Sequence, residues 1–347
     1  QTAQAQGGIN KAVDEDDIQG HINDTLKSSH NLGSKEAISL MCKNAQKTID
    51  WLDQIGVPFS RTNDGKIKQR PLGGASKSRA CYSSDYTGLK ILHTLYDTCI
   101  KNDIKFLNEY MLLNLIIEDN IIKGITALNI KTTEVIEILA KTVILATGGY
   151  SAIYGEQTTN SYATTGDGVA IALKAGVDVS NLEFVQFHPT SMLSNSILIS
   201  ESARGEGGYL VDQNGNRFIN ELKPRDIVAR AIYKKIVYGD TIYLDLRHLG
   251  LDKIMETMPQ ERDLAMKFAN IKLENELLPI TPSAHYSMGG ITTDINCKTN
   301  IQNLFAVGEC ADASIHGANR LGGNSLLEII TFGKIAGVNA STSKIDF

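Results

Sequence analysis

Five cationic or imidazole side chains stand beside glycine or proline at widely separated places in the chain. They are His188 in QFHPT, Arg204 in ARGEGG, Arg225 in PRD, His285 in AHYSMGG and Arg320 in HGANRL. Arginine offers a fork of N–H donors that matches a carboxylate, and histidine adds single donors. The set favours a pocket that grips a small molecule with two carboxylates. Each residue alone could equally be a surface ion pair or a satisfied core histidine.

Apolar stretches that end in glycine form the second signal. Gly148 and Gly149 follow VILAT, Gly308 follows LFAV, and Gly7 and Gly8 follow a run of small residues. Glycine at a strand end lets the backbone approach a phosphate group or a flat ring, and a helix N-terminus there stabilises an anion. A tight turn explains each glycine equally well. The dinucleotide fingerprint GxGxxG does not occur in the sequence, so it would have to lie upstream.

Composition and charge limit the class of protein. The 347 residues are 42% hydrophobic and 21% charged, which is typical of a globular protein with two domains or one large insertion. The net charge of −5 and the pI near 5.8 give no basic footprint for nucleic acid. No apolar run is long enough to span a bilayer, so membrane attachment would need a partner. The five cysteines form no CxxC pair, and we expect no metal site.

Apolar periodicity indicates the elements that position these loops. Residues 33–57, 89–99 and 326–338 have helical spacing, and a further helix opens at Gly166 and stops at Gly176. Residues 104–138 predict short strands with a turn at 118–120. Buried strands at 142–149 and 303–308 lie on either side of a mixed segment, 182–284. Strand, glycine turn and helix on both sides of an insertion predict an α/β fold: a doubly wound, Rossmann-like domain interrupted by an α+β domain.

Twelve runs, taken in order, carry a resemblance to a known family. The runs are QAQGG (4–8), QRPLGG (69–74), Arg79 with DYTG (85–88), ATGG (146–149), TTGDG (164–168), NLEFVQFHPT (181–190), ESARGEGGYLV (201–211), PRD (224–226), YLDLRHLG (243–250), AHYSMGG (284–290), FAVGEC (305–310) and HGANRLGGNSL (316–326). In this order they resemble the flavoprotein subunits of fumarate reductase and succinate dehydrogenase, over nearly the whole chain. The resemblance implies FAD as the cofactor and interconversion of fumarate and succinate as the activity.

The resemblance also implies domains and cofactor contacts. Residues 1–181 would be the first part of the FAD-binding domain without its N-terminal phosphate loop, 182–284 the capping domain, and 285–347 the second part without a C-terminal helical region. The chain has no initiator Met, and both ends are expected to be cut. The implied FAD contacts are Gln6, Gly7, Gly8, Ala146, Thr147, Gly148, Gly149, Asp167, Glu309, Arg320, Asn324, Ser325 and Leu326.

Substrate and proton-transfer roles follow from the same resemblance. His285 and Arg320 resemble the pair that grips one carboxylate, and His188 and Ser200 the pair that holds the other. Arg225 resembles the general acid. Glu201 and Arg204 resemble the relay that returns its proton, and Leu72 and Gly73 lie in the loop that would wall the substrate.

Two positions depart from the family pattern. Gln1 stands where family members with covalently bound flavin carry a histidine. Glutamine cannot form that bond, so we expect FAD to be bound non-covalently. We also expect the protein to favour fumarate reduction over succinate oxidation. Leu72 replaces a phenylalanine that presses on the substrate; leucine keeps an apolar wall without the flat face.

Two other interpretations compete with a fumarate reductase. L-aspartate oxidase shares many of the motifs, but it carries an acidic residue in the loop that corresponds to 69–79, and QRPLGGASKSR has none. A fragment inactive by itself is the second. The resemblance further implies an iron–sulfur subunit and a quinone-linked membrane anchor, with the protein peripheral on the cytoplasmic membrane and its cytoplasmic face favoured over the periplasmic one.

Overall fold

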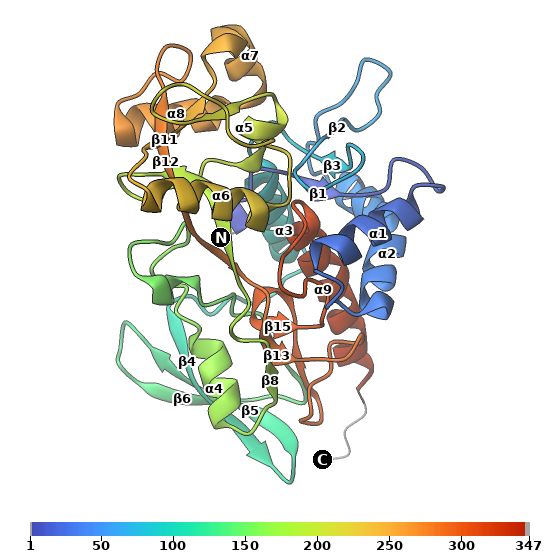
Figure 1. Cartoon of the computed structure of the whole chain (residues 1–347). Helices are drawn as coiled ribbons and strands as arrows, with labels where there is room; N and C mark the ends of the chain where they lie inside the picture. Colours follow the sequence, from blue (N-terminus) through green and yellow to red (C-terminus); the bar gives the residue numbers. More distant parts are fainter. Residues whose placement is uncertain (1, 344–347) are drawn as a thin grey trace.

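A four-stranded antiparallel sheet with flanking helices forms the upper part of the molecule in Figure 1. The computed structural model describes residues 2–343. The sheet has the order β10-β11-β12-β9. We call residues 185–287 the β9–β12 unit; it contains β9 (Val185–Met192), α5 (Glu201–Gly205), β10 (Tyr209–Val211), α6 (Arg225–Val237), β11 (Ile242–Asp245), a 3₁₀ turn (Arg247–Leu249), α7 (Gly250–Thr257), α8 (Pro259–Ala269) and β12 (Leu278–Ser287).

The β9–β12 unit has an apolar core of its own. Ile242 and Leu244 of β11, and Leu278 and Ile280 of β12, are buried at alternate positions along their strands, in one apolar cluster with Val228 of α6. Period-two burial on one sheet face and helical burial above it are the expected pattern for an α+β layer. This core fixes the ends of β9 and β12, which run on into the rest of the molecule.

Four long helices dominate the other part: α1 (Ile18–Ser28), α2 (Lys35–Gln54), α3 (Thr87–Lys101) and α9 (Asn324–Thr342). The Ser34 side chain accepts a hydrogen bond from the backbone N–H of Ala37 and so caps α2. Buried residues at helical spacing, from Ala37 to Leu52, pack α2 against α1 and α9. This part also contains α4 (Asp167–Lys174) and 3₁₀ turns at Thr2–Gln4, Ser151–Tyr154 and Gly308–Cys310.

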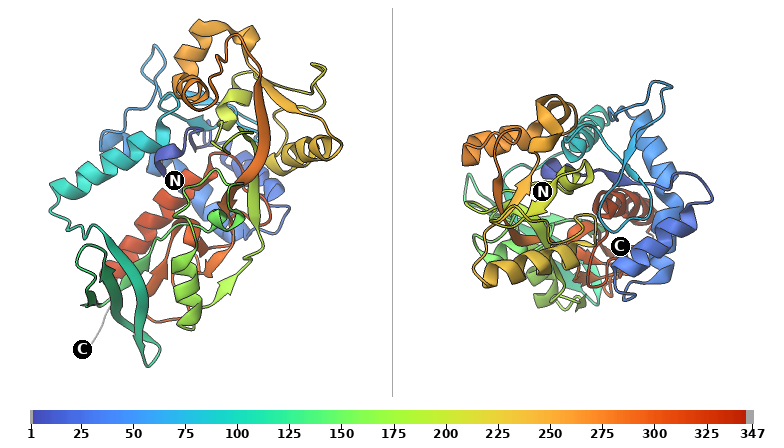
Figure 2. Two further views of the ribbon diagram at one scale, coloured as in Figure 1. Left: turned by 90° about the vertical axis from the view of Figure 1, so that its left-hand side faces the viewer. Right: turned by 45° about the horizontal axis from the view of Figure 1, so that its top comes forward.

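Small sheets complete the structure, and the antiparallel meander of residues 110–139 lies at its lower end in Figure 2. β4 (Tyr110–Glu118), β5 (Ile121–Asn129) and β6 (Val135–Leu139) form an antiparallel meander, and β7 (Val143–Leu145) pairs in parallel with β14 (Leu304–Ala306). The remaining strands are β1 (Ile9–Asn10), β2 (Gln69–Arg70), β3 (Ala80–Cys81), β8 (Val179–Ser180), β13 (Gly290–Thr292) and β15 (Ala311–Asp312). The parallel pair ends beside the loops of Gly148 and Gly308.

Most elements expected from periodicity are confirmed. α2, α3, α4 and α9 lie where helices were predicted, and β4 to β6 where short strands were. The predicted turn lies between β4 and β5, where Asp119 and Asn120 have φ of 49° and 63°, as a two-residue hairpin requires. α1 was not predicted. The expected doubly wound sheet stays a prediction; the mixed helix and strand architecture is what the structure establishes.

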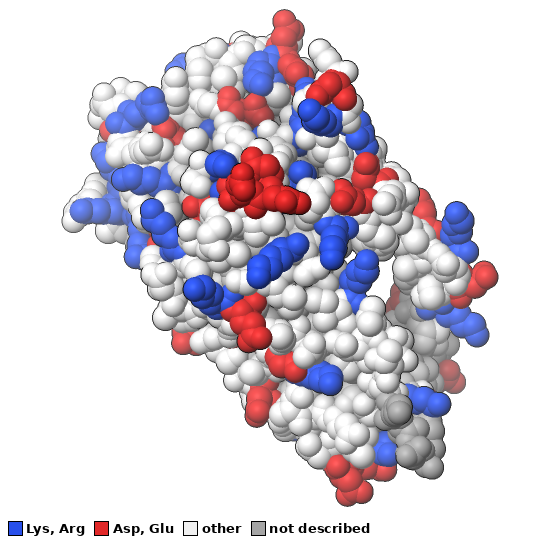
Figure 3. Space-filling model, turned by 90° about the vertical axis from the view of Figure 1, so that its right-hand side faces the viewer, with Lys and Arg blue, Asp and Glu red and all other residues white. Residues whose placement is uncertain are grey.

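The face of the molecule in Figure 3 carries mixed charge, and the described helices include no candidate membrane span. On the face in Figure 3, lysine and arginine side chains lie among aspartate and glutamate side chains. Among residues 2–343, no helix is both long enough and apolar enough to cross a bilayer.

Candidate active site

A cavity of about 390 Å³ lies between the β9–β12 unit and the loops at the ends of β7 and β14. The predicted site residues that line it are Gln6, Gly7, Gly8, Ala146, Gly148, His188, Ser200, Glu201, Arg225, His285, Glu309, Arg320, Ser325 and Leu326. These residues come from across the sequence, so the fold brings together most of the set that the motifs indicate.

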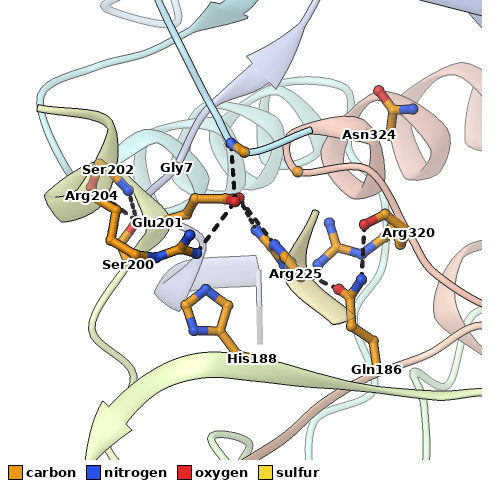
Figure 4. A network of polar contacts seen from close by, with 12 residues as sticks. Gly7, Gln186, His188, Ser200, Glu201, Ser202, Arg204, Arg225, Arg320 and Asn324 are labelled. Atoms are coloured by element: carbon orange, nitrogen blue, oxygen red, sulfur yellow. Dashed lines mark hydrogen bonds and ion pairs between the residues drawn. The ribbon is translucent and has the colours of Figure 1, made fainter. Parts of the chain in front are cut away.

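Glu201 is the centre of the polar network in Figure 4. Its Oε2 accepts hydrogen bonds from Arg225 Nε (3.0 Å) and Nη2 (2.7 Å). Its Oε1 accepts from the Gly73 backbone N–H (3.1 Å) and from Arg204 Nη2 (3.3 Å). Burial alone would raise the pKa of Glu201, but the charges of Arg225 and Arg204 hold it below its usual value. Glu201 is therefore a buried carboxylate with all its lone-pair directions in use.

Backbone without side chains makes room for this carboxylate. A Cβ atom at Gly73 or at Gly322 would collide with the Glu201 carboxyl group. The predicted Gly73 thus contacts Glu201 and does not line the cavity itself, and the same holds for Arg204, which lies behind Glu201. Arg204 also donates to the backbone carbonyl of Glu221. Burial lowers the pKa of Arg204, and Glu201 opposes that shift.

Gln186 connects two of the arginines. Its Oε1 accepts from Arg225 Nη1 (3.1 Å), and its Nε2 donates to the Arg320 backbone carbonyl (2.8 Å) and to Asn319 Oδ1 (2.9 Å). Gln186 was not predicted. It lies two residues before His188 on β9, and side chains two apart on a strand share a face, so that spacing could have identified it.

His188 and His285 face each other across the paired strands, with ring centroids 4.9 Å apart. Ala284 pairs with Phe187 and Tyr286 with Gln186, so β12 has one extra residue, His285, at this point. An extra residue in one strand of a pair re-aims a side chain. The Nδ1 atom of His285 bonds to Thr159 Oγ1 (2.7 Å), and His188 Nδ1 is held by Thr190. In each ring Nε2 is therefore the nitrogen that remains for a ligand.

Both rings are neutral at physiological pH. Burial, followed by the charge of Arg225, holds the pKa of His188 well below its usual value. Burial, Arg225 and Arg320 do the same for His285. Neutral imidazoles donate a single hydrogen bond and add no positive charge. The positive charge at the cavity comes from the arginines.

Arg320 is the arginine best placed to take a ligand carboxylate. Its guanidinium lies 4.3 Å from the centre of the Tyr286 ring, and its Nε has no hydrogen-bond partner among the described residues. Burial and the nearby Arg225 lower the pKa of Arg320 to about 10, which leaves it charged. Tyr286, which was not predicted, is itself held by a hydrogen bond from its hydroxyl to Glu328 Oε2 (2.9 Å). An unpartnered buried donor beside a cavity indicates where a ligand would bind.

Ser200 and Leu72 lie at the opposite wall. Ser200 precedes α5, and its Oγ accepts from the backbone N–H of Ser202 (3.2 Å). A Cβ atom at Gly7 would lie 3.8 Å from Leu72 Cδ1 and 3.9 Å from Ser200 Oγ. Leu72 itself is buried and is not part of the cavity lining. It packs directly behind two residues that are.

The lower half of the cavity fits a cofactor with phosphates and a flat ring. Gly8 has φ of +126°, and a Cβ there would meet the Cys81 carbonyl oxygen at 2.7 Å. Gly148 has φ of +75° and open space where a Cβ would stand, so backbone alone faces the cavity. The N-terminal residues Ser325 and Leu326 of the 19-residue helix α9 also line it. Free backbone N–H groups at such an end favour an anion. The residues therefore fit FAD.

Glu309 lies at the same wall and accepts a hydrogen bond from the Ser287 backbone N–H (3.0 Å). Loss of solvent around it raises its pKa to about 7. A Cβ atom at Gly149 would lie 2.5 Å from Glu309 Oε1. The missing side chain at position 149 therefore leaves room for the Glu309 carboxyl group. Glu309 can exchange a proton near neutral pH.

Four predicted cofactor contacts are not part of the cavity lining: Thr147, Asp167, Asn324 and Gly149, which lies against Glu309. Thr147 and Asp167 are exposed. Asn324 is fully buried; its Oδ1 accepts from Asn10 Nδ2 (2.8 Å) and bonds to His21 Nε2 (2.9 Å). It ties the start of α9 to β1 and α1. The prediction for Gln1 lies outside the described residues.

Comparisons with known proteins agree with this geometry. A family model described as an FAD binding domain matches residues 1–326. The 8-methylmenaquinol:fumarate reductase flavoprotein subunit of Wolinella succinogenes is 42% identical, covering 98% of this chain and 59% of that protein. The succinate dehydrogenase flavoprotein subunit of Rickettsia conorii is 40% identical, covering 98% of this chain and 63% of that protein.

A solved structure gives the same result for the fold. Quinol-fumarate reductase with menaquinol molecules is 36% identical, with a TM-score of 0.95 over 100% of this chain and 65% of that chain. The chain spans about three fifths of the length of the curated relatives it matches. The family match over residues 1–326 and relatives aligned along nearly the whole chain show that this chain belongs to the FAD-binding domain family and resembles the flavoprotein subunits of fumarate reductase and succinate dehydrogenase.

Proposed function

We propose that the protein interconverts fumarate and succinate with FAD and that it works mainly as a fumarate reductase. The observation that carries this proposal is a charge imbalance at the cavity. Arg225 and Arg320 line the cavity and Arg204 lies behind Glu201, so three buried arginines face one paired carboxylate, Glu201, and Glu309, whose pKa is raised to about 7. With Glu309 protonated the excess is two positive charges, which a ligand with two carboxylates would balance.

The two carboxylates of the ligand would bind at opposite walls of the cavity. Arg320 and His285 would bind one carboxylate. Arg320 Nε has no hydrogen-bond partner among the described residues, and His285 bonds to Thr159 through Nδ1, which leaves Nε2 for the ligand. His188 and Ser200 would bind the other at the opposite side of the cavity. Two anchor points on opposite walls restrict the rotation of a small ligand, and such restriction lowers a reaction barrier by several kcal/mol.

FAD, when bound, would supply hydride exchange with the substrate. The side chains of the protein would supply the proton. Arg225 is the candidate donor because both Nε and Nη2 are bound to Glu201 while Nη1 meets only Gln186. Glu201 would return a proton to Arg225, and Arg204 on its other oxygen would extend the relay. Arginine is a weak acid, so this role depends on tight positioning against a developing carbanion.

Organisation and setting are also proposals. We infer that residues 182–284 form a capping domain over a Rossmann-like FAD-binding domain made of 1–181 and 285–347; the separate apolar core of the β9–β12 unit supports this division. Gln1 supports non-covalent FAD. An iron–sulfur subunit and a quinone-linked anchor would hold the protein at the cytoplasmic membrane, with its cytoplasmic face favoured; the relatives, which are named as flavoprotein subunits, support such an assembly.

The test is a pair of assays on the full-length protein loaded with FAD. Reduced viologen with fumarate should be oxidised, and the product should be succinate. Hydrogen peroxide formed with L-aspartate, and no turnover of fumarate, would contradict the proposal in favour of an L-aspartate oxidase. Acid precipitation should release the flavin into the supernatant, whereas flavin fluorescence in the pellet would contradict non-covalent binding.

A further inference from the structure

Glu261 is a fully buried carboxyl group outside the proposed proton relay. It is the third residue of α8, and its exposed fraction is 0%. Its Oε1 accepts a hydrogen bond from the backbone N–H of Ser200 (2.9 Å), the residue proposed to hold a substrate carboxylate. Glu261 therefore lies directly behind one wall of the cavity.

A second buried carboxyl group faces it from outside the β9–β12 unit. Asp85 belongs to the turn before α3 and is also 0% exposed. Its Oδ2 accepts from the backbone N–H groups of Gln260 (2.7 Å) and Glu261 (3.2 Å). Met258 gives α8 no side-chain cap, so Asp85 caps this helix from the other part of the molecule.

One acceptor of Glu261 has no hydrogen-bond partner. Its Oε2 is buried and unpaired among the described residues, and so is Oε1 of Gln6, whose carboxamide lies near the same carboxyl group. Two unpaired acceptors in a dry site are costly, whereas a protonated carboxyl group adds a donor. Gln6 lines the cavity on the cofactor side. Glu261 thus lies between a substrate contact and a cofactor contact.

Charge balance also requires a proton here. The charged groups that face Glu261 are Asp85 and Arg70 of β2. On α8 itself, Arg262 pairs with Glu274. Asp263 pairs with Lys267. Arg70 donates to the carbonyls of Gly7 (2.9 Å), Gln6 (2.6 Å) and Ser84 (3.0 Å), and it makes no ion pair with either carboxyl group. One guanidinium balances one carboxylate, and a second buried negative charge would be uncompensated.

The proton belongs to Glu261, not to Asp85. Both carboxyl groups are fully buried, and burial raises the pKa of each. Asp85 accepts two N–H bonds at a helix N-terminus, where the backbone favours a negative charge and opposes that rise. Glu261 accepts a single backbone N–H bond, has the Gln6 carboxamide as its other polar neighbour, and faces the charge of Asp85. Burial, followed by Asp85, raises the pKa of Glu261 to about 8.

We propose that Glu261 is a positioning residue, kept neutral by Asp85, that holds Ser200 and Gln6 at the two sides of the cavity. The proposal rests on the proposed function, because Ser200 is taken to bind a substrate carboxylate. When Glu261 loses its proton at alkaline pH, a negative charge appears behind Ser200. That charge repels the carboxylate bound in front of it, and substrate affinity falls while the chemical step is little affected.

The experiment compares pH profiles of full-length, FAD-loaded proteins from about pH 6 to about pH 9, with fumarate and reduced viologen. In the unsubstituted protein, KM should rise about tenfold through pH 8 while kcat changes little. Glu261→Gln keeps an acceptor for Ser200 and cannot ionise, so its KM should stay low through the same range. Glu309 titrates in both proteins, so the difference between their profiles isolates Glu261.

Two further variants keep the test decisive. Glu256→Gln, the same substitution at an exposed position of α7, should keep the original profile. Asp85→Asn removes the repelling charge, so the rise in KM should move to lower pH. FAD content and thermal unfolding check that each variant folds.

Each outcome has one meaning. A rise in KM that persists unchanged in Glu261→Gln, or that also vanishes in Glu256→Gln, overturns the role of Glu261 and leaves the proposed function intact. Absence of fumarate turnover in the unsubstituted protein at every pH overturns the proposed function and this inference with it. A rise that is lost only in Glu261→Gln supports both.

Discussion

Glu201 and Glu261 are two buried glutamates of the β9–β12 unit whose pKa values are shifted in opposite directions. Their exposed fractions are 1% and 0%, so burial does not distinguish them. Glu201 accepts N–H bonds from two arginines and from Gly73, and its pKa is lowered. Glu261 accepts one bond and faces Asp85, and its pKa is raised to about 8. The neighbours, not the depth, decide which carboxyl group carries a charge.

The difference matters for what each residue can do. In the proposed relay, Glu201 would exchange protons with the arginines that it touches. A neutral Glu261 would add no charge to a cavity whose positive excess is proposed to bind the substrate. We therefore propose different roles for two residues of the same type: proton transfer for Glu201 and positioning for Glu261. The following predictions, from the largest expected effect to the smallest, test that division.

Substitution at the relay should have the largest effect on activity. Arg225→Lys removes the fork that binds Glu201 through Nε and Nη2. We expect kcat to fall about 10³-fold, because a displaced general acid loses most of its contribution. Steady-state kinetics with fumarate provide the measurement. Arg230→Lys on the same helix, where the side chain is 80% exposed, is the control and should keep full activity. Equal activity of the two variants would remove Arg225 from the relay.

Neutralising each glutamate separately should affect folding unequally. Glu201→Gln leaves Arg225 and Arg204 without their buried counter-charge, and we expect a loss of about 3 kcal/mol in the free energy of unfolding. Glu261→Gln replaces a neutral acid with a neutral amide of the same shape and should cost less than about 1 kcal/mol. Urea unfolding near neutral pH measures both. Equal losses would show that the two carboxyl groups carry the same charge.

The pH dependence of stability should differ in sign. The folded-state pKa of Glu201 is lowered, so its contribution is present above its unfolded-state pKa and is lost as pH falls. The folded-state pKa of Glu261 is raised, so its contribution is present below its unfolded-state pKa and is lost as pH rises through about 8. In a plot of the urea midpoint against pH, the fall at acid pH (the acid limb) should therefore disappear in Glu201→Gln. The fall toward alkaline pH (the alkaline limb) should become smaller in Glu261→Gln. An unchanged alkaline limb would indicate that Glu261 is ionised already.

Asp85→Asn should have the smallest net effect on stability. The variant weakens the cap of α8 by about 1 kcal/mol. It also relieves the repulsion of Glu261, which partly offsets that loss. The clearer readout is the alkaline limb of the stability curve, which should level off at lower pH, because its end is set by the folded-state pKa of Glu261 and its onset by the unfolded-state value. A limb that stays in place would show that Asp85 does not influence Glu261.

The sequence predicts the elements whose pattern is local. The spacing of Ala37 to Leu52 indicates α2, and the hairpin turn at Asp119 and Asn120 is visible in the chain. α1 has no such signal, because buried positions such as His21, Thr25 and Ser28 are polar. They are satisfied by long-range hydrogen bonds; His21 bonds to Asn324, 303 residues away. Apolar periodicity cannot detect a helix face that is buried through polar contacts.

Some residues of the candidate site can likewise be predicted from the sequence, and others cannot. Glycine-flanked loops and the family resemblance identify Glu201, Arg225 and Arg320, which the fold brings to one cavity. Glu261 cannot be found in this way. An acid in the first turn of a helix is ordinarily an exposed residue that favours the helix dipole. Its partner Asp85 lies 176 residues away in the sequence, and only the fold brings the two together.

The extra residue in β12 has a consequence for anyone who shortens or redesigns this chain. Ala284 and Tyr286 pair with consecutive residues of β9, so His285 is the only residue at that point without a cross-strand partner. Deleting it would restore a regular ladder, which ordinarily favours a β-sheet. The same deletion would remove one of the two facing imidazoles, while Ala284 and Tyr286 could keep their partners on β9. A more regular sheet would therefore lose part of the candidate site, and idealising this strand is the wrong way to stabilise the protein.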